Sequence, residues 1–258
     1  MAQFDTMRAD GVAGVQSAAI DAGLRAHMNK VYGTMSVGML ITFAAAWALS
    51  GLSVTDVPTQ YQIGPDEYLT GLGYALYASP LKWLVMFAPL GFVIGLSAMI
   101  NRMSAATAQF VFYAFAATMG VSISSIFLVY AGYSIAQVFL ITSIAFAGLS
   151  LYGYTTKKDL SGMGTFLIMG VIGLIVAMIV NLFIGSSLLM FAISVIGVLI
   201  FAGLTAYDTQ SIKKEYIAHA QNGDSEWMGK SVIMGALRLY LDFINMFMFL
   251  LSIFGSRE

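Results

Sequence analysis

The chain has 258 residues, of which 59% are hydrophobic and only 10% are charged, and its formal net charge is −1. Soluble domains carry about 25% charged residues, so this composition is typical of a membrane protein. The small net charge gives no indication of a nucleic-acid partner, and the absence of cysteine from the sequence excludes disulfides and thiolate metal sites.

Residues 1–24 are polar and lack the apolar core of a signal peptide, so we expect them to form a cytoplasmic tail. Residues 25–258 are expected to form one membrane domain, because they contain seven apolar runs near the ~20 residues that a spanning helix needs. In chain order the runs are residues 31–52, 81–100, 106–130, 134–154, 164–184, 187–207 and 232–254. The predicted fold is therefore an all-α integral membrane protein with seven transmembrane helices.

The basic residues alternate between the two sides of these spans. One side holds Arg8, Arg25, Lys30, Arg102, Lys157, Lys158, Lys213, Lys214 and Lys230. The other side holds only Lys82 and Arg257. Since cytoplasmic segments are enriched in Lys and Arg, we expect the N-terminus to be cytoplasmic and the C-terminus to be outside.

Charged residues in the last two runs are the candidates for chemistry. Asp242 follows Val232 by ten residues, or about 15 Å of helix, which places it near the middle of the bilayer. An ionised carboxylate is strongly disfavoured there unless it is paired, and such residues often mark ion or proton pathways. Arg238 precedes it by one helical turn, so the sequence leaves open a structural Arg238–Asp242 pair or a titrating, ion-binding carboxylate.

Asp208, at the end of the sixth run, is a second acid that could also be simply interfacial. If the sixth and seventh helices pack together, Asp208 and Asp242 would share a proton, because two adjacent carboxylates cannot both ionise cheaply. Such a pair would sense pH. Arg102, at the end of the second run, either latches onto these acids or extends to the lipid headgroups. Asn245 would support ion coordination.

Two segments resemble a known family. GLTAYDTQSIKK at residues 203–214 and ALRLYLDFINMF at residues 236–247 closely resemble the signature of the Bax inhibitor-1 (transmembrane BAX inhibitor motif) family, in its bacterial YccA-like branch. The resemblance covers the chain from about Lys30 to its end. It implies a bundle in which the last helix is surrounded by the other six, in the bacterial inner membrane.

The resemblance also implies a function, that of a pH-sensitive calcium leak channel without a resident cofactor. The family's paired aspartates match Asp208 and Asp242, which would bind calcium weakly and transiently. An arginine near the end of the second helix matches Arg102. Arg238 departs from relatives that have a small polar residue there, and its charge would compete with calcium beside Asp242.

Other functions remain as alternatives. An intramembrane aspartyl protease needs Gly-x-Gly-Asp and a late Pro-Ala-Leu motif, whereas Asp242 follows Leu239-Tyr-Leu and the last proline is Pro89. With no His-Glu-x-x-His motif either, we expect no enzyme. A scaffold could bind membrane proteins such as proteases through residues 209–231, and a cation/proton antiporter would also suit the acid pair, although no inverted repeat is visible. The expected partners are the bilayer, calcium ions and protons, and no nucleic acid.

Overall fold

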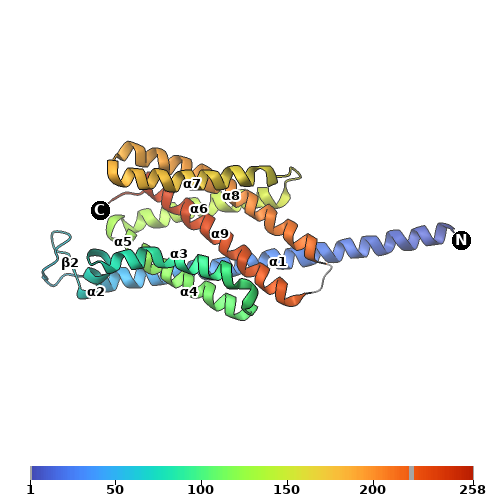
Figure 1. Ribbon diagram of the computed structural model, residues 1–258, viewed down its shortest axis with the longest axis horizontal. Coiled ribbons are helices and arrows are strands. Elements are labelled where there is room, and N and C mark those ends of the chain that lie inside the picture. The colour runs from blue at the N-terminus through green and yellow to red at the C-terminus, as the bar shows by residue number, and fades with distance from the viewer. Residues whose placement is uncertain (1, 221–223, 258) are drawn as a thin grey trace.

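The computed structural model describes residues 2–220 and 224–257, and it is a bundle of long helices (Figure 1). Seven helices are long and apolar enough to cross a membrane, which confirms the predicted fold class. They are α1 (Ala2–Ser53), α3 (Leu81–Met99), α4 (Ala105–Ile123), α6 (Gly132–Thr155), α7 (Ser161–Ile184), α8 (Ser187–His219) and α9 (Ser225–Phe254).

The first helix extends well beyond its apolar run. α1 is continuous from Ala2 to Ser53, so the described backbone of the predicted tail is helical, and this end of α1 projects from the bundle (Figure 1). Leu24 and Met28 are already buried in the core. The packing of α1 therefore begins about two turns before the first apolar run, at a stretch whose outer residues are polar.

Short elements connect the first three spans and complete the third. They are β1 (Val54–Thr55), β2 (Tyr68–Leu69), α2 (Gly71–Gly73), the π-helical turn η1 (Tyr74–Ala78), the 3-10 turn η2 (Ile100–Arg102) and α5 (Ile126–Val129). The two strands pair in antiparallel fashion. The third span is broken between α4 and α5, where the Ser124 hydroxyl bonds the Val121 carbonyl and the Tyr77 hydroxyl. These bonds supply partners for polar groups at a helix break.

The last helix is central. In the most apolar 18-residue stretch of α9, 61% of the residues are buried, whereas the corresponding share is 11% in α3 and in α7. α9 packs against α1, α4, α6 and α8, while α3 packs mainly on α4 and α7 on α8. Figure 1 shows α9 running obliquely through the middle of the bundle. The outer helices direct large apolar side chains such as Phe166, Met169 and Phe183 away from the protein, as lipid-facing surfaces require.

Glycines allow some helices to approach closely. A Cβ atom added at Gly153 of α6 would lie 2.2 Å from the carbonyl oxygen of Ala206 in α8. A Cβ atom added at Gly120 of α4 would lie 2.4 Å from the carbonyl oxygen of Thr42 in α1. Small residues are used in this way in membrane helix packing, and the first contact fixes α8 against α6 two residues before Asp208.

Candidate functional site: a buried pair of aspartates

The predicted acid pair is brought together where α8 packs along α9. α8 does not end near Asp208 but continues to His219, so Asp208 lies within a helix. The carboxyl groups of Asp208 and Asp242 lie within hydrogen-bonding reach of each other. Asp242 is only 4% exposed, and Asp208 is half-buried. The packing of these two helices thus creates the contact that the sequence left conditional.

One oxygen of Asp242 has no hydrogen-bond partner among the described residues. Its Oδ2 atom is buried, and no described residue gives it a hydrogen bond. A buried polar atom without a partner costs about 1–3 kcal/mol, so native structures usually provide one. A proton shared with Asp208, a water molecule or a transient cation would each supply that partner. This geometry suits a carboxyl group that gains and loses a proton or a bound cation.

Arg238 does not form the ion pair with Asp242 that the sequence left open. Its Nη1 atom lies 2.7 Å from Oε1 of Glu215 in α8, and the Ser211 hydroxyl donates to the same oxygen at 3.1 Å. Arg238 still lies close enough to act electrostatically on both aspartates. Glu215 was missed from the sequence, although it follows Asp208 by seven residues and so shares a face of α8 with it.

The structure does not bring Arg102 into this cluster. Arg102 ends η2 at the surface of the protein, and no described residue forms an ion pair with it. Of the two roles left open for this residue, its exposed position suits the headgroup contact. The amide of Asn245 donates to the Leu241 carbonyl of its own helix at 2.8 Å. A role for Asn245 in ion coordination stays a prediction.

The aspartate pair by itself offers few metal ligands. Among the described residues, no group of three or more His, Cys, Asp or Glu side chains is placed to hold a metal ion. Calcium usually takes six to eight oxygen ligands, and the aspartate pair would supply carboxylate oxygens from only two residues. Any calcium there would need water to complete its shell, so the arrangement suits transient coordination.

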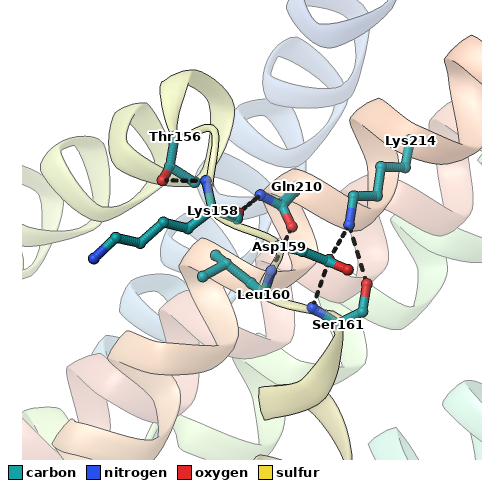
Figure 2. A network of polar contacts seen from close by, with 7 residues as sticks. All are labelled: Thr156, Lys158, Asp159, Leu160, Ser161, Gln210 and Lys214. Carbon is teal, nitrogen blue, oxygen red and sulfur yellow. Dashed lines mark hydrogen bonds and ion pairs between the residues drawn. The ribbon is translucent and has the colours of Figure 1, made fainter.

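A polar network fixes the α6–α7 connection on α8 just beyond the acid pair (Figure 2). The Gln210 side chain, 5% exposed, accepts from the Leu160 amide at 2.9 Å and donates to the Lys158 carbonyl at 2.8 Å. One turn later, Lys214 binds the Asp159 carboxylate and the Ser161 hydroxyl. The Lys214 ammonium holds the pKa of Asp159 below its usual range, with help from hydrogen bonds of Ser161.

Most of the segment 209–231, considered above as a partner-binding region, is helical. Residues 209–219 belong to α8 and residues 225–231 to α9, while residues 221–223 lie outside the described part of the chain. Apolar periodicity failed to reveal these helical turns, because they lie beyond the apolar run and carry many polar side chains.

The comparisons with known proteins identify the family. Residues 24–258 match the family model described as "Inhibitor of apoptosis-promoting Bax1". The chain belongs to the Bax inhibitor-1 family. This family membership confirms the resemblance found in the two segments that carry Asp208 and Asp242.

Bacterial relatives cover nearly the whole chain. Inner membrane protein YbhL of Escherichia coli K12 is 44% identical over 240 residues, which cover 92% of this chain and 94% of that protein. A Caulobacter vibrioides protein is 44% identical over 93% of this chain and 92% of its own length. A Rickettsia prowazekii protein is 43% identical over 92% of each. With seven candidate spans, the chain is a multi-pass inner-membrane protein, as predicted.

Proposed function

We propose that this protein is a pH-sensitive cation leak channel, with calcium as its permeant ion and the Asp208–Asp242 pair as its gate. The observation that carries this proposal is the contact of the two carboxyl groups between α8 and the central helix α9, with one oxygen of Asp242 left without a partner among the described residues. Ionisable residues inside spans are expensive, and they typically mark ion or proton pathways.

The gate works through the protonation state of the pair. When one proton is shared, the two carboxyl groups hydrogen-bond and hold α8 against α9, which closes the path. When the proton is lost, two negative charges face each other in a poorly hydrated site, and their repulsion separates the helices unless a cation lies between them. Because Glu215 engages Arg238, the cluster keeps an excess of carboxylates over cations, which attracts a permeant cation.

Weak coordination is what a leak requires. A path conducts when an ion enters a site readily and also leaves it readily. With carboxylates from only two residues, the pair binds calcium through a partly hydrated shell, so the ion is released easily. A cation/proton antiporter would use the same pair, but it would couple each cation to protons moving in the opposite direction.

The scaffold alternative has no specific observation in its favour. A partner-binding surface on residues 209–231 would present free charged side chains, but several are engaged within the chain. Lys213 binds the Tyr154 carbonyl, Lys214 binds Asp159, Glu215 binds Arg238, and Glu226 accepts from the Ala105 amide. A partner would have to displace these contacts or bind elsewhere.

Calcium flux into proteoliposomes of the purified full chain tests the proposal. The parent should conduct, with a flux that changes between about pH 6 and pH 8, because two adjacent buried carboxyl groups titrate closer to neutral than isolated ones. Asp208→Asn and Asp242→Asn should each abolish that pH dependence, because an amide does not titrate in this range. Asp56→Asn, in an exposed position of the outer connection, is the matched control and should behave like the parent.

Each other outcome is also decisive. If both variants keep the pH dependence of the parent, the aspartate pair is not the gate. If the parent carries no more calcium than empty liposomes at any pH, the channel proposal is wrong and partner binding becomes the next hypothesis. If flux occurs only with a counterflow of protons, the protein is an antiporter.

A further inference from the structure

A groove of about 580 Å³ opens between α1 and α6. On α1 it is lined by Arg25, Met28, Asn29 and Tyr32, which recur at the spacing of one helical face. On α6 it is lined by one face of the segment from Phe146 to Tyr154. The groove is therefore formed by two continuous helix faces.

The lining changes from polar to apolar along the groove. Arg25 and Asn29 precede the apolar run of α1, and Tyr154 lies one residue before the end of α6, whereas Phe146 and Ala147 lie about two turns further into α6. Eight residues separate Tyr154 from Phe146, or about 12 Å of helix. Half of the hydrocarbon core measures about 15 Å. The gradient thus matches a phospholipid, with its headgroup at the surface and an acyl chain inside.

The charge at the polar end favours an anionic headgroup. Arg25 is exposed and forms no ion pair with a described residue. On the α6 side, the Lys213 ammonium donates to the Tyr154 carbonyl at 2.7 Å and lies 5.1 Å from the centre of its ring. None of the described residues that line the groove is acidic. Two cations therefore flank the opening, and none of its described lining residues carries a carboxylate. Such an opening suits a phosphate group.

The base of the groove is tied to α8. The Tyr32 hydroxyl bonds the Ser150 hydroxyl, which in turn lies 2.9 Å from the hydroxyl of Thr209. This chain of hydroxyl groups links α1, α6 and α8, so the groove is held in shape by three helices. A preformed site loses less conformational freedom on binding than one that must be ordered by its ligand.

We propose that this groove binds an anionic phospholipid of the leaflet at the N-terminal end of α1. Arg25 and Asn29 bind the phosphate, and an acyl chain lies along Phe146 and Ala147. The site is separate from the aspartate pair and does not depend on channel activity.

Native mass spectrometry of the full chain in detergent tests this site, with phosphatidylglycerol and phosphatidylcholine of identical acyl chains as the probes. The parent should bind phosphatidylglycerol more tightly. Arg25→Gln should weaken that binding about tenfold, the size of one charge-assisted hydrogen bond, and remove the preference. Ala147→Phe, which fills the apolar half of the groove, should weaken the binding of both lipids. Lys30→Gln, an exposed α1 residue that does not line the groove, should leave it unchanged.

Three results would overturn the proposal. The first is equal affinity of the parent for the two lipids. The second is an equal loss in Arg25→Gln and Lys30→Gln, which would indicate diffuse attraction to a basic surface. The third is displacement of bound phosphatidylglycerol by glycerol 3-phosphate, measured at the lipid concentration that half-saturates the site. Such displacement would make free phosphate the ligand. Should Ala147→Phe fail to fold, the comparison of Arg25→Gln with Lys30→Gln still decides, because both residues are exposed.

Discussion

Arg238 of α9 pairs with Glu215 of α8, with 2.7 Å between Nη1 and Oε1, and not with Asp242 on the next turn of its own helix. Asp242 instead has Asp208 of α8 within hydrogen-bonding reach. Two contacts between the same helices thus involve three carboxyl groups and one guanidinium. The unmatched negative charge is what a proton or a passing cation would balance.

The Arg238–Glu215 pair predicts a measurable coupling between α8 and α9. Arg238→Gln and Glu215→Gln should each lower the melting temperature in detergent. The double variant should melt only slightly below either single variant. The side chains are 36% and 39% exposed, so we expect a coupling energy of about 1 kcal/mol or less. Strictly additive losses would show that the two side chains do not interact.

The Asp159–Lys214 pair predicts a loss of stability in acid. In the folded protein the pKa of Asp159 is lowered from its usual 3.8, mainly by its hydrogen bond with Lys214, so the pair favours folding above that value. As the pH falls through and below 3.8, the unfolded chain binds the proton first and the contribution disappears. Asp159→Asn should therefore melt below the parent at neutral pH, and the gap should narrow in acid.

Lys157 provides the control for this pair. It is an exposed lysine of the same connection and is not part of the ion pair. Lys157→Gln should leave the pH profile of the melting temperature unchanged, whereas Lys214→Gln should alter it as Asp159→Asn does. If the melting temperatures of the parent and Asp159→Asn differ by the same amount at every pH, the Asp159–Lys214 pair does not cause the loss of stability in acid.

Gln210→Ala should destabilise the protein by about 1–3 kcal/mol, because the buried amide of Leu160 and the Lys158 carbonyl both lose their partner. The matched control is Gln109→Ala. Gln109 is exposed, and its one hydrogen bond to a described residue is to the Tyr113 hydroxyl one turn away in its own helix, so its loss should cost much less. Urea or heat unfolding of both variants in detergent measures the difference, and equal losses would remove the special role of the Gln210 bridge.

Two glycines of α6 should respond to alanine with opposite sign. Gly153→Ala would push a Cβ atom against the Ala206 carbonyl of α8, and overpacking of this kind costs about 1–3 kcal/mol. Gly148 has open space around its Cβ position, so Gly148→Ala should be neutral or stabilising by up to about 1 kcal/mol through helix propensity. Melting temperatures of both variants test this contrast, and a harmless Gly153→Ala would mean that α6 and α8 are not in close contact there.

The sequence by itself determined the seven spans and the family. Whether a segment can cross a bilayer depends on its own length and polarity, because every backbone polar group must be satisfied within the segment. The runs at 81–100 and 134–154 therefore predicted the positions of α3 and α6 closely. The acids Asp208 and Asp242 could likewise be singled out because a charge in an apolar run is costly wherever its helix lies.

Only the tertiary structure decided which side chains meet. Glu215 lies beyond the apolar run, and its contact with Arg238 depends on how α8 continues and how it is rotated against α9. Arg102 and Asn245 carry suitable groups, but packing places the first at the surface and turns the second onto its own helix. The groove between α1 and α6 arises from the spacing of two helices. Contacts of this kind depend on rotations and distances between helices, and apolar patterning leaves both open.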